Sequence, residues 1–271
     1  MTAACTPEFV VPADFVVPAE FVALAGRLAD AARPVIRKYF RTPVAVDDKA
    51  DASPVTIADR EVEATMRALI AETFPEHGIL GEEHGRHNTD AEWVWVLDPI
   101  DGTKAFITGK PSFGTLIALA HRGKPVLGVI DQAILDERWL GGAGHPTTLN
   151  GQPARVRACD ALAKAYAYTT GPEFFDADTL PAWNRIAERV KQPRYGCDCY
   201  AYALLTSGFV DLVVEAGLKP YDYAALVPVI ENAGGTVTDW QGQPLTIASD
   251  GRVCAAGDGR LHALALEVLA G

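Results

Sequence analysis

Two aspartates three residues apart, Asp98 and Asp101, have the type and spacing that most directly suggest chemistry in this chain. They end the segment Trp93-Val-Trp-Val-Leu-Asp-Pro-Ile-Asp-Gly-Thr103, in which an apolar, strand-like run is followed by carboxylates. Carboxylates at a strand end project into a shared crevice and can hold a hard cation together. Gly102 permits a ligand to approach the backbone, and a helix beginning at Thr103 would direct its free N–H groups at an anion. A plain Asp-Pro turn followed by a helix cap is the structural alternative.

Three further acidic segments could contribute to the same crevice. Glu82 lies in Gly81-Glu82-Glu83, sixteen residues before Asp98, a separation that fits the neighbouring ends of antiparallel strands. Asp59 lies at the start of a predicted helix, and Asp222 lies at the start of another. Each also has a structural explanation, as a solvated loop or as a helix cap.

The elements that must position these residues follow from hydrophobic periodicity. The first half predicts helices at 20–40 and 57–74, with Pro34 kinking or splitting the first. Residues 41–56 predict a loop or hairpin. Short apolar runs then predict a mainly antiparallel sheet, with strands at 78–82, 93–98, 113–122, 125–132 and 137–141.

The second half alternates strands and helices, which is typical of an α/β layer. Strands are predicted at 163–169, 210–215, 236–240 and 253–256, and helices at 179–190, 199–207, 222–232 and 258–269. Gly234-Gly235 can end the third of these helices through a left-handed cap. We expect two parts, 1–145 and 146–271, without a long linker between them.

The composition limits the partners of the protein. Its 271 residues include 24 Lys and Arg against 35 Asp and Glu, a formal net charge of −11. An acidic chain is a poor general binder of nucleic acid or anionic membranes. The sequence shows neither a membrane-spanning apolar run nor a secretory signal, and its five scattered cysteines do not suggest a disulfide framework. We therefore expect a cytoplasmic protein with no nucleic-acid or membrane partner.

Four segments, in order, resemble the inositol monophosphatase family: SPVTIADREVEA around Asp59, GEEHG around Glu82, WVLDPIDGTKAFITG and YDYAALVPVIENAGG. The resemblance runs from about residue 20 to the C-terminus. It implies an α/β protein, a layered αβαβα sandwich of the inositol monophosphatase and fructose-1,6-bisphosphatase type. The N-terminal α+β part would bind metal and phosphate, and the C-terminal α/β part would supply the leaving-group pocket. It also implies a homodimer that hydrolyses a small phosphomonoester.

The resemblance also implies roles for individual residues. Glu82, Asp98 and the Ile100 carbonyl would hold one Mg²⁺; Asp98, Asp101 and Asp222 would hold a second; and a third, weaker ion would lie near Glu82 and Asp59. Thr103, hydrogen-bonded to Asp59, would orient and deprotonate the attacking water. The N–H groups of Gly102 and Thr103 would receive the phosphate, and Lys49 would lie near it. Two or three Mg²⁺ ions per site would offset the repulsion between an acidic protein and its anionic substrate.

The segment GCDCYAYALLTSGFVDLVVEAGLKPYD resembles the histidinol-phosphatase branch of the family. Histidinol phosphate carries an ammonium and an imidazole in its leaving group, to which Asp198 and Glu215 could make charge-assisted hydrogen bonds. Asp198 could instead cap the helix at 199–207, and Glu215 would also suit a hydroxylated substrate. We therefore expect a histidinol-phosphatase of histidine biosynthesis. The alternatives are an inositol-1-monophosphatase or broad polyol phosphatase and, less strongly, a non-catalytic metal-binding homologue.

Overall fold

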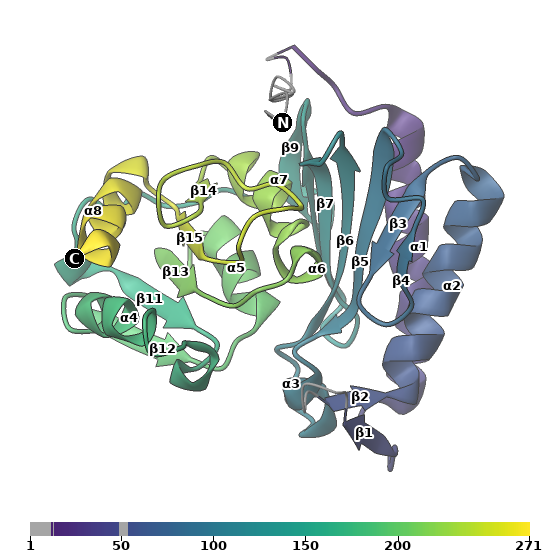
Figure 1. The fold of residues 1–271 in the computed structure, drawn as a ribbon, viewed down its shortest axis with the longest axis horizontal. Coiled ribbons are helices and arrows are strands. Elements are labelled where there is room, and N and C mark those ends of the chain that lie inside the picture. Colours follow the sequence, from purple (N-terminus) through teal and green to yellow (C-terminus); the bar gives the residue numbers. More distant parts are fainter. Residues whose placement is uncertain (1–11, 13, 49–53) are drawn as a thin grey trace, which may run out of the picture.

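The protein is a stack of alternating helical and sheet layers (Figure 1). The computed structural model describes residues 12, 14–48 and 54–271. From the N-terminal side, the order is two helices, an eight-stranded sheet, a middle layer of helices, a five-stranded sheet and two outer helices (Figure 1). This arrangement confirms the predicted αβαβα sandwich.

The first half contains α1 and α2, both packed on one face of the larger sheet (Figure 1). That sheet has the order β10-β9-β8-β7-β6-β5-β3-β4, and a separate hairpin, β1-β2, precedes α2. The bounds are α1 Ala19–Tyr39, β1 Val46–Asp48, β2 Pro54–Thr56, α2 Ile57–Thr73, β3 Gly78–Gly81, β4 Gly85–His87, β5 Trp93–Asp101, α3 Thr103–Ile107, β6 Gly114–His121, β7 Lys124–Gln132, β8 Glu137–Gly142, β9 His145–Leu149 and β10 Gln152–Pro153.

The second half contains the smaller sheet, of order β12-β11-β13-β15-β14. In it β11 pairs in parallel with β12 and β13, whereas β15 pairs antiparallel with β13 and β14. The bounds are η1 Leu162–Lys164, β11 Tyr166–Thr169, η2 Pro172–Phe174, α4 Leu180–Ala187, β12 Gln192–Tyr195, α5 Cys199–Thr206, β13 Leu212–Glu215, α6 Pro220–Tyr223, α7 Leu226–Glu231, β14 Thr236–Thr238, β15 Val253–Ala256 and α8 Gly259–Ala270.

The continuous apolar run of β5 reflects burial on both faces. Trp95 and Leu97 belong to the core beneath α1 and α2, whereas Val94 and Val96 belong to the core shared with the middle helices. Successive strand residues point to opposite faces, so an internal strand of a sandwich must be apolar throughout. The same rule places Val213 in the middle core and Leu212 in the outer core beneath α4 and α8.

Most predicted elements are present, and the differences have local causes. Pro34 lies inside α1, which continues through it as one helix. The helix predicted at 222–232 is divided into α6 and α7. Pro228 has no N–H to donate to the carbonyl four residues earlier, that of Ala224, which lies between the two helices. Four short strands, β4, β9, β10 and β12, were not predicted.

The larger sheet continues to Pro153, and the smaller sheet begins at Tyr166. The strand β9 therefore crosses the expected division at 145/146 and pairs with β8. The assignment of two functional parts with that boundary stays a prediction.

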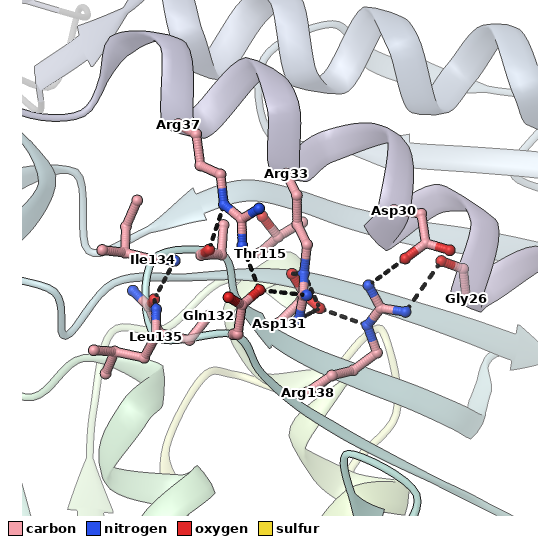
Figure 2. A network of polar contacts seen from close by, with 12 residues as sticks. Gly26, Asp30, Arg33, Arg37, Thr115, Asp131, Gln132, Ile134, Leu135 and Arg138 are labelled. Atoms are coloured by element: carbon pink, nitrogen blue, oxygen red, sulfur yellow. Dashed lines mark hydrogen bonds and ion pairs between the residues drawn. The ribbon is translucent and has the colours of Figure 1, made fainter.

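Asp131, near the end of β7, anchors α1 to the sheet (Figure 2). Its side chain is fully buried, and Arg33 of α1 donates to it from Nε at 2.9 Å and from Nη2 at 3.0 Å. Arg138 of β8 donates from Nε at 2.5 Å and also reaches Asp30 of α1 at 2.7 Å. One buried carboxylate thus pairs with two arginines from different elements.

Replacing Asp131 by Ala is expected to lower the free energy of unfolding by about 3 kcal/mol or more, because two partly buried guanidinium groups lose their buried counter-charge and keep only exposed partners. Urea denaturation measures this change. Asp30→Ala is the matched control, since Asp30 is an exposed partner of Arg138 and its loss should have a much smaller effect. Equal losses in the two variants would show that Asp131 is not the anchor.

Candidate active site

A cavity of about 510 Å³ lies where elements of both halves meet. The first half contributes the segment after β3, the end of β5 and α3, and the second half contributes residues around β11, η2, α5, β13 and α6. Seven of the predicted site residues line this cavity: Glu82, Asp101, Gly102, Thr103, Asp198, Glu215 and Asp222. The structure therefore brings together predicted residues that are far apart in the chain.

Asp98, Asp101 and Asp222 form the acidic centre of this site. One oxygen from each lies within 4.8 Å of the others. Burial raises the pKa of Asp98 and Asp101 well above the ordinary value, and the neighbouring carboxylates raise both further. Burial likewise raises the pKa of Asp222 to about 7. Three carboxylates gathered at one point, Asp98 buried and the other two partly buried, repel one another unless a cation is present.

The donor set fits a hard divalent cation. Asp98, Asp101 and Asp222 offer only oxygen ligands, which Mg²⁺ prefers. The Ile100 carbonyl, also predicted as a ligand, accepts a hydrogen bond from the Thr103 hydroxyl at 3.2 Å. The residues present are thus chemically suited to Mg²⁺.

Backbone amides fix the orientation of these carboxylates. The Ile100 N–H donates to Asp98 Oδ1 at 3.0 Å. The Lys219 N–H donates to Asp222 Oδ2 at 2.6 Å, so Asp222, the third residue of α6, helps to cap the helix by accepting the N–H of its N-cap residue. The Cys199 N–H, from the other half of the chain, donates to Asp101 Oδ2 at 2.6 Å. The capping explanation and the cation-binding explanation are therefore compatible.

Glu82 reaches the cluster through a parallel strand pair, which corrects the antiparallel arrangement expected from its spacing. In the sheet, β3 pairs in parallel with β5, with Gly81 opposite Leu97, and the Glu82 N–H donates to the Leu97 carbonyl at 3.2 Å. Parallel strands run in the same direction, so the residue after Gly81 lies beside the residue after Leu97. Glu82 is therefore next to Asp98 at the same edge of the sheet. The intervening residues form β4, which pairs antiparallel with β3 and returns the chain to the start of β5.

Thr103 lies between the cluster and Asp59. Its hydroxyl has two acceptors within reach of its one proton, Asp59 Oδ1 at 3.5 Å and the Ile100 carbonyl at 3.2 Å. Asp59 is buried and forms a capping box with Thr56, whose N–H and hydroxyl both donate to Asp59 Oδ2. Burial raises the pKa of Asp59 despite these bonds. A carboxylate held in this way is placed to accept a proton from Thr103.

Gly102 adopts a left-handed conformation, with φ of 89°, at the start of α3. A side chain here would be strained, and a Cβ atom would lie 2.7 Å from Cγ of Asp198. The Asp198 carboxylate therefore lies against the backbone that was predicted to receive the phosphate.

Asp198 precedes α5, but its side chain makes no capping hydrogen bond to that helix. Its Oδ2 instead accepts a hydrogen bond from the Ser112 hydroxyl at 3.2 Å. Burial raises the pKa of Asp198, while Ser112, Lys110 and Lys104 act to lower it. The side-chain capping explanation is wrong, and the carboxylate lines the cavity.

Glu215, at the end of β13, is buried with both oxygens hydrogen-bonded. The Thr170 N–H donates to Oε1 and the Tyr202 hydroxyl donates to Oε2, each at 2.8 Å. Burial raises the pKa of Glu215, whereas these two bonds oppose the rise. Glu215 is thus a firmly held acceptor in the wall of the cavity.

Some residues were missed or cannot be placed. Lys49 lies outside the described residues, so its predicted proximity to phosphate stays a prediction. Lys104, Lys110 and Lys219 line the cavity and were not predicted. Glu63, buried on α2 one turn after Asp59, was also missed. Its spacing of four residues from Asp59 on one helical face was the available signal.

Comparison with known proteins agrees with the motifs. The model of the inositol monophosphatase family matches residues 18–270. The bifunctional phosphatase IMPL2, chloroplastic, of Arabidopsis thaliana is 56% identical over 251 residues, which cover 89% of this chain and 72% of that protein. A histidinol-phosphatase of Chlorobaculum parvum is 35% identical, covering 86% of this chain and 90% of that one.

A solved structure of an inositol monophosphatase from Zymomonas mobilis superposes with a TM-score of 0.87. It is 49% identical, and the match covers 94% of this chain and 100% of the other. Among the residues that our structure describes, no helix is long and apolar enough to cross a membrane.

Without divalent metal, the free energy of unfolding is expected to fall as the pH rises from about 4 to about 7. The folded state holds the Asp222 proton up to a pKa of about 7, whereas the unfolded chain releases it near the ordinary value of 3.8. The stabilisation is therefore complete below pH 3.8 and is lost as the pH approaches 7. Urea denaturation at several pH values, with a chelator, measures it.

Asp222→Asn should reduce this pH dependence, because the amide does not titrate, whereas Asp98 and Asp101, whose pKa is also raised, still contribute to it. Asp250→Asn, at an exposed position outside the cavity, is the control. The explanation is wrong if wild type and Asp222→Asn lose stability equally over this pH range.

Proposed function

This chain belongs to the inositol monophosphatase family, and we propose that within the family it is a Mg²⁺-dependent histidinol-phosphatase. It would convert L-histidinol phosphate and water to L-histidinol and phosphate. The observation that carries the choice of substrate is the placement of Asp198. This partly buried carboxylate lies beside Gly102 and is not used to cap α5.

The charge pattern of the cavity supports a substrate with an anionic end and a cationic end. Lys104 and Lys110 are near enough to Asp198 to oppose the rise in its pKa, and they suit a phosphate dianion. Asp198 and Glu215 suit an ammonium or an imidazolium, whose charge-assisted hydrogen bonds strengthen in a partly dry cavity. A polyol leaving group would leave the Asp198 charge without a counter-charge from the substrate.

The metal ligands carried over from the family are compatible with the geometry. We propose two principal Mg²⁺ sites, one at Glu82, Asp98 and the Ile100 carbonyl and the other at Asp98, Asp101 and Asp222. A weaker third site would lie near Glu82 and Asp59. When bound, these ions supply positive charge that activates water and offsets charge on the phosphate oxygens.

The side chains of the chain itself account for the remaining tasks. Asp59 accepts the hydrogen bond of Thr103 and so holds the hydroxyl ready to transfer a proton from the attacking water. The N–H groups of Gly102 and Thr103 receive the phosphate at the start of α3. The cysteines near the cluster are poor nucleophiles, because burial raises the pKa of Cys197 and Cys199. Direct attack by water is therefore the favoured route.

Hydrolysis of inositol-1-phosphate or of several polyol phosphates is the second candidate. The related Zymomonas protein is an inositol monophosphatase and the Arabidopsis relative is called bifunctional. Glu215 would accept hydroxyl hydrogen bonds as readily as cationic ones. A non-catalytic role is disfavoured, since Asp59, Glu82, Asp98, Asp101, Thr103 and Asp222 are all present. A homodimer and a cytoplasmic location stay predictions.

Phosphate release from histidinol phosphate and inositol-1-phosphate, each with Mg²⁺, tests the substrate. We expect kcat/KM to favour histidinol phosphate by about 100-fold, equivalent to about 2.7 kcal/mol. Asp198→Asn should remove most of this preference while retaining hydrolysis of inositol-1-phosphate, whereas Asp178→Asn, outside this cavity, should behave as wild type. Equal wild-type rates would favour the broad phosphatase, and no release from any phosphomonoester would favour the non-catalytic homologue.

Asp98→Asn is expected to reduce turnover by at least about 10³-fold, because Asp98 is the ligand common to both principal metal sites. Burial beside other carboxylates makes the neutral side chain structurally acceptable, so the variant should fold. Steady-state kinetics measures the turnover of Asp98→Asn, and circular dichroism checks that the variant is folded. Turnover near the wild-type level would contradict the two-metal assignment.

A further inference from the structure

We propose that Glu63 and Arg67 of α2 are positioning residues that hold Glu82 in its place beside Asp98. The inference rests on the proposed function, in which Glu82 binds Mg²⁺. It assigns a role to a buried ion pair that the predicted ligands and substrate contacts leave unused.

Glu63 holds the chain immediately after Glu82. Its carboxylate is fully buried, and its Oε2 accepts the N–H of Glu83 at 2.6 Å. Its Oε1 accepts the N–H of His84 at 3.1 Å and Nε of Arg67 at 2.7 Å. Both backbone amides that follow Glu82 are therefore bound by one side chain.

The chain before and beyond this turn is held by the same pair. A Cβ atom at Gly81 would lie 2.0 Å from Oε1 of Glu63, so the backbone approaches the carboxylate as closely as glycine allows. The Arg67 guanidinium also donates from Nη2 to the Gly85 carbonyl. Glu63 and Arg67 thus contact residues on both sides of Glu82.

This contact is needed because the sheet stops supporting the chain at Glu82. The last ladder bond on the β5 side is the one from the Glu82 N–H to the Leu97 carbonyl, after which the chain turns into β4. Glu63 supplies the acceptors that the β5 backbone no longer offers. A buried ion pair is seldom the most stabilising choice for a core position, which favours a positioning role over a purely structural one.

The helix α2 therefore contributes two carboxylates that contact residues of the site. Asp59, in its first turn, faces Thr103, and Glu63, one turn later, faces the Glu82 segment. A rigid helix fixes these two carboxylates relative to each other. The position of Glu82 is therefore coupled to that of Asp59 and Thr103.

Mg²⁺ binding by isothermal titration calorimetry, without substrate, tests the proposal on the full chain. Glu63→Gln should weaken binding by about tenfold, the lower end of the usual effect of a residue that supports a metal ligand. Glu61→Gln is the matched control on the same helix, since Glu61 is exposed and bonds Tyr39 and Lys38. Amide hydrogen exchange at Glu83 and His84 should also be faster in Glu63→Gln only.

The double variant separates positioning from general stability. If Glu63 acts through Glu82, then Glu63→Gln should change Mg²⁺ affinity less than about twofold in a Glu82→Gln background. A tenfold loss in both backgrounds would overturn the proposal. If Glu63→Gln does not fold, Arg67→Gln tests the proposal instead, because it removes the contact with the Gly85 carbonyl and the ion pair with Glu63. Unchanged Mg²⁺ affinity in Arg67→Gln would overturn the proposal.

The wild-type protein distinguishes this inference from the proposed function. Wild type that binds Mg²⁺ and releases phosphate, with Glu63→Gln indistinguishable from it, would overturn only the positioning role. Wild type that neither binds Mg²⁺ nor hydrolyses a phosphomonoester would overturn the proposed function and this inference together.

Discussion

Repulsion among three closely spaced carboxylates is the constraint on which this structure depends. Asp98, Asp101 and Asp222 approach within 4.8 Å although burial already disfavours their charged forms. The fold tolerates this arrangement because a backbone N–H donates to each of the three, from Ile100, Cys199 and Lys219 respectively. These bonds orient the oxygens without supplying a full counter-charge, which a bound cation would supply.

The same constraint joins the two halves of the molecule. Asp101 belongs to the strand β5, yet its hydrogen-bond donor is Cys199 at the start of α5. The middle helices can approach the larger sheet because β7 carries a glycine at the contact: a Cβ at Gly128 would lie 2.0 Å from the Ala225 carbonyl oxygen. Close packing of the halves is therefore part of the construction of the site, and the cavity is assembled only when both sheets are formed.

Some residues around the cluster are held by near neighbours in the sequence, and others by distant segments. Asp59 and Asp222 are held by residues three positions away, through the capping geometry of α2 and α6. Glu82, Asp98 and Asp101 depend on strand pairing, and Glu215 depends on Thr170 and Tyr202. Charges of the opposite sign, from Lys104 and Lys110, act on Asp198 within the same cavity.

What the sequence by itself determined were the features governed by near neighbours: helix and strand periodicity, the capping aspartates, and the motif residues that resemble one family. Only the tertiary structure decided the parallel pairing of β3 with β5, the contact of Asp198 with Gly102, and the burial of Glu63 against the Glu82 segment. Capping and periodicity involve residues a few positions apart, so they can be recognised in the chain. Strand partners and side-chain contacts between distant segments depend on how whole layers pack, and no local pattern specifies them.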